Sequence, residues 1–547
     1  MNKKKRCLAL ICALAAISAV SGCGEKKNNV ADDCGFSETG YPIVSKPLKL
    51  TAMAKKDPLH GDWNETYWAQ WAKEKSGIDI DFEYVDKASW DQKKQLLFAA
   101  KELPDLIFSG GGGLSKVDEM QYGPNGMLVD MAEYIDKYAP NLKKALDDFP
   151  KVKANITTPD GNIYALPKIS YSIDSVRRIW INQEWLDKLG LKKPETIDEL
   201  NKVMIAFRDN DPDGNGQKDT YAASGVFMNY EGDFRYLVLR AYGFLDTGFS
   251  VDGEKVIYPP YDPLFKEYLK EMNYLYKEGL IDSEYFTQSE AEYKAKSSQV
   301  KVGIGCWSSP AASGGMSPED EKKYTNVIPL TSEFNSTRVW DKAGSKEDAY
   351  GSTGCFAISA DCKYPEAAMR WADMWYSEEG GIVANIGPKL GEFKAHADGG
   401  YTVDENGEWT QVYPKDDKRN TWTYYNQVWA PASGNCNFSL QPEFFSKKKG
   451  VKELNLYKLG AAMKEYSKDS KLYSMPGFYF DKEQQNSLSV TKTEIEAYVQ
   501  KMESKFITGE EPLENFDKYL ADLKQYGVET LLEAYQKAYK EYLNAIK

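Results

Sequence analysis

One short segment, DPDGNGQKD (Asp211–Asp219), carries oxygen-bearing side chains at every second position around a glycine. This is the ligand order of the first part of an EF-hand calcium loop. The expected ligands are Asp211, Asp213, Asn215, the carbonyl of Gln217 and Asp219. The glutamate of the twelfth position is missing, because Ala222 stands there. Since calcium takes six to eight oxygens, we expect a site that draws further oxygens from elsewhere in the fold; the alternative is a solvated turn without metal.

Such an ion would have a structural role. The segment directly follows a predicted helix, which opens at Thr196 and Glu199 with the spacing of a capping box. It does not follow the carboxyl end of a strand, where the ligands of open α/β sheets collect. We therefore expect calcium to stabilise a turn, and we expect no cofactor for catalysis.

The composition excludes several other kinds of site. The 547 residues include only two histidines, His60 and His396, so a zinc site built from several histidines is not expected. The formal net charge of −13 is repelled by phosphate backbones, so we expect no nucleic-acid partner. The motifs G-x-x-x-x-G-K-[ST], G-x-S-x-G and H-E-x-x-H do not occur, which leaves ATP hydrolysis and two common hydrolase mechanisms without support.

The N-terminus has the pattern of an exported, lipid-anchored protein. A basic stretch, MNKKKR, precedes an apolar run too short for a permanent membrane helix, and the run ends in VSGC, which resembles a bacterial lipobox. An ordinary secretory signal with a chance cysteine is the alternative. We expect residues 1–22 to be a signal peptide, Cys23 to carry the lipid and residues 23–46 to be a flexible tether. The expected location is the outer face of the bacterial cytoplasmic membrane, facing the exterior or a periplasm, with the lipid as the sole membrane contact.

The body of the chain alternates strands and helices. Residues 48–54 and 78–85 alternate in polarity as strands do, on either side of a helical segment that ends at Gly77. Residues 300–307 form another predicted strand, and the chain beyond about Asn486 reads as helices. The order predicts an α/β fold with mostly parallel sheets flanked by helices.

Six stretches of the chain, taken in order, carry a family resemblance: LVDMAEYIDKYAPNL, GNIYALP, INQEWLDKLGLKKPETIDEL, DPDGNGQKD, LYKEGLID and EAAMRWADMWYSEEGG. Together they resemble the lipid-anchored extracellular solute-binding proteins, family 1, of sugar ABC transporters. The C-terminal segment Lys505–Leu543 is similar too, and is most like the oligosaccharide-binding branch. The resemblance extends from the lipobox to nearly the last residue.

The resemblance implies a two-lobed, type II periplasmic-binding-protein-like fold with a ligand cleft between the lobes. Residues 47–547 would form this bilobal domain. The first lobe would hold about 47–170 and a segment after about 351, and the second about 171–350 and part of the C-terminal helices. Family members deliver a captured sugar to a membrane permease, so the implied partners are a carbohydrate, with an oligosaccharide favoured, and ABC transporter permease subunits. Nothing in the sequence requires more than a monomer.

Aromatic rings suit a sugar site because they cover the C–H face of the sugar, while hydroxyls and amides orient its rim. We interpret Trp371 and Trp375, four residues apart on a predicted helix, as core. The resemblance implies that Trp307, directly after a strand, stacks on the sugar; edge-of-sheet packing is the alternative. The other expected ligand contacts, on loops or near strand ends and hinge crossings, are His60, Trp63, Asn64, Ser109, Tyr171, Tyr350, Trp422 and Tyr425.

Two other classes of function stay open at this point. A surface glycosidase or lyase acting on polysaccharide would need two carboxylates about 5 to 9.5 Å apart, and 82 acidic residues leave such a pair possible. A sugar sensor or adhesin could use the same bilobal body. We expect a binding protein and not an enzyme, because no nucleophile pattern accompanies His60.

Overall fold

The computed structural model describes residues 33–170, 178–229, 232–307, 310, 316–339, 350–419, 421–433, 436, 438–449 and 472–546. Two expected functional residues, Cys23 and Tyr171, lie outside the described residues. The chain divides into two units, Met1–Asp33 and Cys34–Lys547, and the described helices and strands belong to the second.

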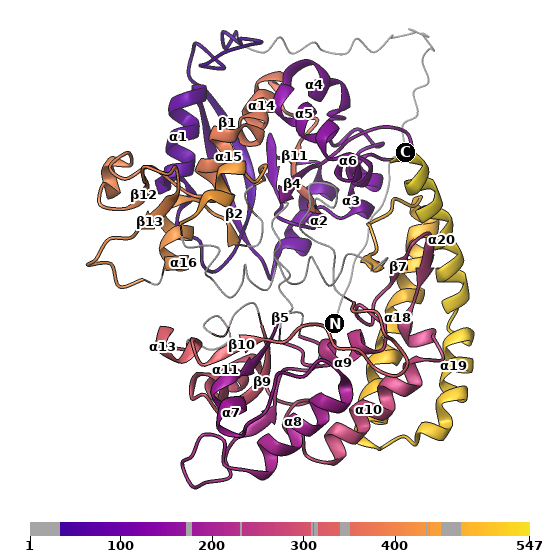
Figure 1. Ribbon diagram of the computed structural model, residues 1–547. Helices are drawn as coiled ribbons and strands as arrows, with labels where there is room; N and C mark the ends of the chain where they lie inside the picture. Colours follow the sequence, from indigo (N-terminus) through magenta and orange to yellow (C-terminus); the bar gives the residue numbers. More distant parts are fainter. Residues whose placement is uncertain are drawn as a thin grey trace, which may run out of the picture. The chain divides into compact units, whose positions relative to one another are not determined.

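The first sheet has five strands in the order β2-β1-β3-β11-β4 (Figure 1). Their bounds are β1 Leu48–Lys56, β2 Ile78–Asp86, β3 Leu106–Phe108, β4 Leu166–Ser170 and β11 Tyr350–Ile358. β1 runs parallel to β2 and β3, whereas β11 runs antiparallel to β3 and β4. The carboxyl ends of β1, β2 and β3 therefore meet at the same edge of the sheet, the edge where α/β proteins place their ligands.

The second sheet has four strands in the order β10-β5-β9-β6. Their bounds are β5 Arg178–Asn182, β6 Tyr221–Ala223, β9 Val302–Trp307 and β10 Tyr324–Asn326. β6 is parallel to β9, but β5 is antiparallel to both β9 and β10. The expected α/β class is confirmed, with a more mixed pairing than the mostly parallel sheets predicted, because β5 and β11 run against their neighbours.

Two smaller sheets complete the strand inventory of the described residues. One pairs β12 Gly400–Val403 with β13 Trp409–Val412, and the other joins β14 Leu472–Ser474, β7 Ser250–Asp252 and β8 Lys255–Ile257. β14 pairs with β7, and a short segment then leads from β14 to the next helix.

Helices cover both faces of the first sheet. One face packs on α1 Tyr67–Ser76, α4 Ala132–Tyr138, α5 Pro140–Asp148, α6 Pro150–Ile156 and α14 Pro365–Asp373, and the other on α2 Trp90–Ala100 and α3 Lys116–Tyr122. The helix ends follow local sequence rules: the Thr66 side chain caps α1, and Gly77, with φ 78°, ends it in the left-handed conformation that glycine favours. Pro365 occupies the first turn of α14, where the missing amide hydrogen of proline costs no helical hydrogen bond.

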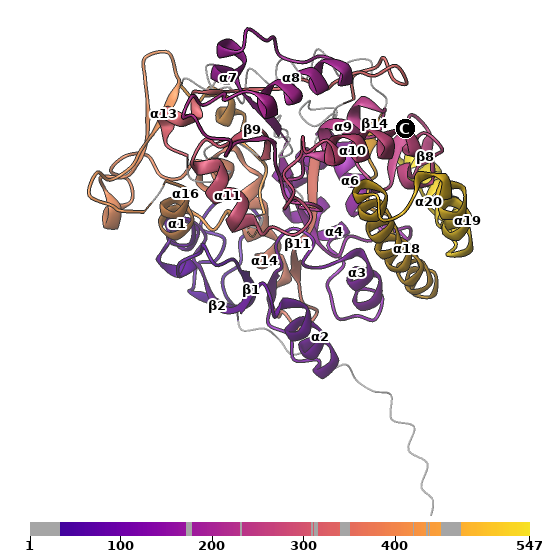
Figure 2. The same ribbon diagram turned by 90° about the horizontal axis from the view of Figure 1, so that it is seen from below.

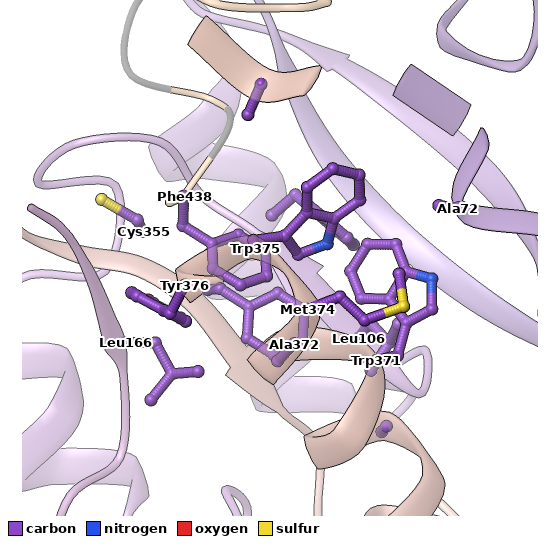
Figure 3. Packing of buried hydrophobic residues seen from close by; sticks show 14 of the residues in the cluster. Ala72, Leu106, Leu166, Cys355, Trp371, Ala372, Met374, Trp375, Tyr376 and Phe438 are labelled. Carbon is purple, nitrogen blue, oxygen red and sulfur yellow. The ribbon is translucent and has the colours of Figure 1, made fainter. Parts of the chain in front are cut away.

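The core against α1 and α14, here the first core, is dominated by stacked and edge-on aromatic rings. Trp371 and Trp375 are 1 % and 0 % exposed, which confirms the prediction that they are core residues. Trp68 stacks on Trp375 with ring centroids 4.6 Å apart. Figure 3 shows Trp371 and Trp375 packed with Tyr376, Met374 and Phe438. Each such ring buries roughly 150–250 Å², so this cluster carries much of the stability of the first sheet.

The second core joins the second sheet to the C-terminal helices. It includes residues of α7 Gln183–Lys188, α8 Ile197–Asp209, α9 Arg235–Ala241, α10 Phe265–Lys277, α18 Lys482–Thr508, α19 Phe516–Gln525 and α20 Val528–Ala545. α18 packs on α10 and on α20, and the three C-terminal helices lie side by side in Figures 1 and 2. The helical C-terminus is thus as predicted. None of the helices in the described ranges combines the length and apolarity that a membrane crossing requires.

The structure corrects the predicted end of the tether. Residues from Cys34 onward belong to the folded unit, although the composition suggested flexible chain up to residue 46. Ile43 and Val44 are buried at 0 % and 2 % exposure in the first core, and the Ile43 amide donates to the Ser76 carbonyl. Arg370 donates to two carbonyls of the same segment. A segment without periodicity is fixed here by contacts with distant residues, which its own sequence does not show.

Candidate ligand-binding site

The loop after β1, residues 57–62, presents polar groups at the carboxyl edge of the first sheet. His60 is 5 % exposed, and its Nδ1 accepts from the Asp57 amide and from the Trp63 indole, each at 3.3 Å. Burial lowers the pKa of His60 to about 4, so the imidazole is neutral near pH 7. A neutral, held imidazole is suited to hydrogen bonding in a binding site. Asn64, beyond the loop, is exposed.

Three predicted ligand residues have packing roles in this structure. Trp63 is 0 % exposed and lies edge-on to Trp68, Phe82, Tyr84 and Phe108. Ser109 is also 0 % exposed, and its hydroxyl donates to the Gly354 carbonyl. Tyr425 is 4 % exposed and donates its hydroxyl to the Ala384 carbonyl at 2.9 Å. The structure assigns these three side chains to the core, in place of the expected ligand contacts, because neighbouring elements cover them.

Trp422 presents an open aromatic face. It lies in α16 Thr421–Tyr424, and its side chain is 51 % exposed. Its ring is parallel to Tyr425, with centroids 5.8 Å apart and an interplanar angle of 11°. α16 continues into a π-helical turn, η6 Tyr425–Trp429, where the buried Asn426 donates to the Trp422 carbonyl and accepts from the Ser433 amide. Trp422 thus rests on a fixed, buried ring and keeps its other face free.

Polar side chains that the sequence did not single out flank α16, with the Arg419 guanidinium 4.9 Å from the centroid of the Tyr424 ring. Arg419 donates to both carboxylate oxygens of Asp417, and its NH1 nitrogen donates to Gln427 Oε1 at 3.1 Å. The hydrogen bond from Arg419 lowers the pKa of Asp417 to about 2, so the pair stays charged. A Cβ added to Gly61 would lie 3.2 Å from the Gln427 carbonyl, so this turn packs on the loop after β1. The clue in the sequence was the charged stretch directly before TWTYYNQVW.

Trp307 and Tyr350 are the remaining expected ligand residues in the described part of the chain. Trp307 ends β9 as predicted, and its ring is 6 % exposed, stacked on Tyr293 at 6.0 Å with the Lys294 ammonium 4.9 Å from the ring centroid. Tyr293, Val302 and Val226 pack around the ring, and Gly232 lies against it. The Tyr350 backbone pairs with Ser170 across β11 and β4.

A cavity of about 400 Å³ lies elsewhere on the first sheet, between α1 and the edge strand β2. Its lining includes Asn64, Gln70 and the ion pair Lys73–Asp79, over a floor of Trp68 and Trp371. It lies along the amino-terminal half of β2, and Asn64 is the one expected ligand residue in its lining, so we do not assign it to the candidate site.

The Asp211–Asp219 loop closes on itself through its own side chains. The Asp211 carboxylate accepts from the amides of Gly214, Asn215 and Gly216. Asn215 Nδ2 lies 2.8 Å from Asp213 Oδ2 and 3.1 Å from Asp219 Oδ1, and the other oxygen of Asp219 pairs with Lys301 at 2.8 Å. Asn215 Oδ1 accepts from the Gln217 amide at 2.7 Å, so turning the Asn215 amide to place its oxygen between these two carboxylates would break that hydrogen bond.

That donor set fits calcium only in part. Gln217 adds a carbonyl, but Ala222 supplies no oxygen at the twelfth position and is 4 % exposed. Across the parts of the chain that the structure describes, no three or more His, Cys, Asp or Glu side chains are arranged to hold a metal.

These features are those of a binding protein. They are two α/β sheets, an open aromatic face beside the strand ends, and polar side chains held by their neighbours. Residues 57–382 match the family model of the bacterial extracellular solute-binding proteins. The chain belongs to this family, which binds solutes and is not a family of enzymes.

Individual relatives share the matched region. The fructooligosaccharide ABC transporter substrate-binding protein FusA of Streptococcus pneumoniae is 35 % identical over 302 residues, 53 % of this chain and 55 % of that protein. The polygalacturonan/rhamnogalacturonan-binding protein YtcQ of Bacillus subtilis is 27 % identical over 56 % of this chain and 57 % of its own length. The matches thus span about half the length of these curated relatives. A solved structure of an S. pneumoniae FusA EF-hand mutant with fructo-nystose has a TM-score of 0.73 and 26 % identity, and the match covers 91 % of this chain and 99 % of that one.

Proposed function

We propose that this protein captures an oligosaccharide outside the cell and delivers it unaltered to the permease of an ABC transporter. The observation that carries the proposal is the likeness to FusA, which extends over nearly the whole of both chains and includes a complex with a fructooligosaccharide. The neutral His60 and the open face of Trp422 fit binding better than hydrolysis. A surface glycosidase, a sensor and an adhesin are the alternatives.

The proposed ligand contacts come from the loop after β1, from α16 and its neighbours, and from the end of β9 in the second sheet. Trp422 would stack on a sugar ring, and Arg419, Asp417 and Gln427 would bind hydroxyl groups. His60, Asn64, Trp307, Tyr350 and Tyr171 stay in the proposal as further contacts. The proposed lobes follow the two sheets, with residues 47–170 and a segment after 351 in one lobe, and 171–350 with part of the C-terminal helices in the other.

The proposed setting is the outer face of the bacterial cytoplasmic membrane. Cys23 would carry the lipid, and residues 1–22 would be removed as the signal peptide. The monomeric body would then stay near its permease without entering the bilayer, since lipid chains on one cysteine are sufficient for stable anchoring.

Neutral fructooligosaccharides should raise the melting temperature of the purified protein. A ligand that binds only the native state stabilises it by mass action, and the shift grows with ligand concentration. Differential scanning fluorimetry with kestose, nystose and a galacturonan oligomer of matched length would rank these ligands. The galacturonan is the control, because its carboxylates are disfavoured by the acidic chain unless the site itself is basic. Cleavage of any of these sugars, detected by chromatography, would replace the binding proposal with an enzymatic one.

We also propose that the Asp211–Asp219 loop binds calcium as a structural ion. The ligands would be Asp211, Asp213, Asn215, Gln217 and Asp219, with Asp219 released from Lys301. The Asp213 carboxyl supports this, because burial and the neighbouring Asp211 carboxylate raise its pKa, and a cation would relieve that strain between like charges.

Removing calcium should lower the melting temperature by about 1 °C for each kcal/mol lost, because unfolding a unit of this size carries an entropy of about 1 kcal/mol/K. Thermal unfolding with EDTA, and again after adding back calcium or magnesium, measures the effect. Asp213→Asn should abolish the calcium response, while Asp209→Asn, just before the loop, should retain it. Identical melting curves with and without chelator would remove calcium from the proposal.

A further inference from the structure

The segment Met475–Asp481, which connects β14 to α18, packs on the second core and also contacts α3 and α6. Phe478 and Phe480 pack on the second core, with Phe480 5.7 Å from the Tyr535 ring. Tyr479, between them, contacts the other side: its hydroxyl lies 2.8 Å from the Glu119 carboxylate of α3 and 3.2 Å from the Ile156 carbonyl of α6, and can donate to either. Alternate residues of an extended segment point to opposite sides. This segment therefore holds the second core against α3 through one side chain.

The contact on α3 is close and centred on a buried carboxyl group. Glu119 is 1 % exposed; its Oε2 accepts from Tyr479, and its Oε1 has no hydrogen-bond partner within the described ranges. The Lys116 ammonium lies 3.7 Å from the centroid of the Tyr479 ring and donates to the Asn155 carbonyl of α6. A Cβ on Gly477 would come within 2.6 Å of Lys116 Cε, so the absence of a side chain there allows the approach.

Few nearby charges stabilise the ionised form of Glu119. Burial raises the pKa of Glu119 to about 7, a shift that Lys116 and the Tyr479 hydrogen bond oppose and Asp118 reinforces. Burial also lowers the pKa of Lys116 to about 8. Of the other groups near Glu119, Asp118 is engaged with Lys94 at 2.7 Å, and the buried Cys355 thiol keeps its proton, because burial raises its pKa to about 12.

We propose that the Glu119–Tyr479 contact is a pH-responsive latch between α3 and the C-terminal segment. A protonated Glu119 is neutral and fits the buried contact, whereas an ionised Glu119 is a buried anion with a single hydrogen bond from Tyr479. The latch is therefore closed under mildly acidic conditions and loosens as the medium becomes neutral to alkaline. This pH response does not depend on the ligand-binding site.

The direction follows from linkage. A folded-state pKa raised from 4.5 to about 7 contributes stability that is complete below pH 4.5 and is lost as the pH rises through 7. Where release of the segment exposes Glu119 fully to solvent, this shift alone changes the docking equilibrium about tenfold between pH 6 and pH 8, which is its upper bound. The lowered pKa of Lys116 acts in the opposite sense and recovers about twofold, so the net loosening is at most about fivefold.

Hydrogen–deuterium exchange of the full chain tests the latch. Corrected for intrinsic exchange rates, opening of peptides covering 475–481 should increase by up to about fivefold from pH 6 to pH 8. Glu119→Gln should abolish this increase. Tyr479→Phe should shift its midpoint to higher pH, because it removes a hydrogen bond that lowers the pKa of Glu119.

His396→Gln is the matched control, since His396 packs on Phe393 and Tyr424 and not on α3. It should keep the wild-type response. Equal opening of wild-type protein at the two pH values, or an undiminished response in Glu119→Gln, would overturn the latch. Should Glu119→Gln fail to fold, an unchanged midpoint in Tyr479→Phe would overturn it as well.

Discussion

Replacing Arg235 by alanine is expected to lower the free energy of unfolding by about 3–5 kcal/mol. Arg235 opens α9 and is 2 % exposed; its guanidinium pairs with Asp233 at 2.5 Å and with Glu503 of α18 at 2.6 Å, both 0 % exposed. Burial alone would lower the pKa of Arg235, but these two carboxylates raise it above its usual value. Without the guanidinium, two carboxylates would be left buried and uncompensated.

The two carboxylates would differ in what remains to hold them. Asp233 would keep the Tyr285 hydroxyl and the backbone amides of Met228 and residue 235 as donors, whereas Glu503 would keep the Tyr268 hydroxyl at 2.7 Å. Glu503 belongs to α18, more than 260 residues from Arg235, so the same substitution should loosen the C-terminal helices from the second core.

Urea denaturation of wild-type protein, Arg235→Ala and the control Arg208→Ala measures this effect. Arg208 is 33 % exposed and pairs with Asp209 at the surface, where such a pair contributes about 0–1 kcal/mol. A loss in Arg235→Ala no larger than that in Arg208→Ala would show that α18 is held by apolar packing alone.

The elements that were predicted well are those whose pattern is local. β1 and β2 alternate in polarity, Gly77 ends α1, and Trp371 and Trp375 share a helical face; each signal lies within one segment. The predicted end of the tether was wrong for the opposite reason. Ile43 and Val44 become core only because α1 and Arg370 lie beside them.

The candidate site shows the same division. In TWTYYNQVW the sequence marks Trp422 and Tyr425 alike, yet one ring is half exposed and the other is covered by the chain near Ala384. The π-helical turn sets that difference, and a π-helix has no simple sequence rule. Similarly, the order of oxygen ligands in the calcium-like loop is local, but the pairing of Asp219 with Lys301 depends on the folded position of β9.

Trp422→Ala is expected to weaken oligosaccharide binding by about 1–3 kcal/mol, roughly 5- to 150-fold in Kd. The indole is 51 % exposed and stands on the buried Tyr425 ring, so truncation removes a ligand surface while leaving the core beneath it intact. The melting temperature without sugar should therefore change little, and isothermal titration calorimetry should detect the whole effect.

Phe334→Ala is the matched control. Phe334 is 46 % exposed and stacks on the buried Tyr242, with ring centroids 5.8 Å apart and an interplanar angle of 26°. Phe334→Ala therefore also removes a half-exposed ring that stacks on a buried tyrosine. Only the Trp422 substitution removes a ring from α16, the helix between Arg419 and Gln427, whose side chains are joined by a hydrogen bond and would orient sugar hydroxyls. If the two variants bind the sugar equally well, the open ring at α16 is not part of the site, and the contacts must be sought around His60 and Trp307.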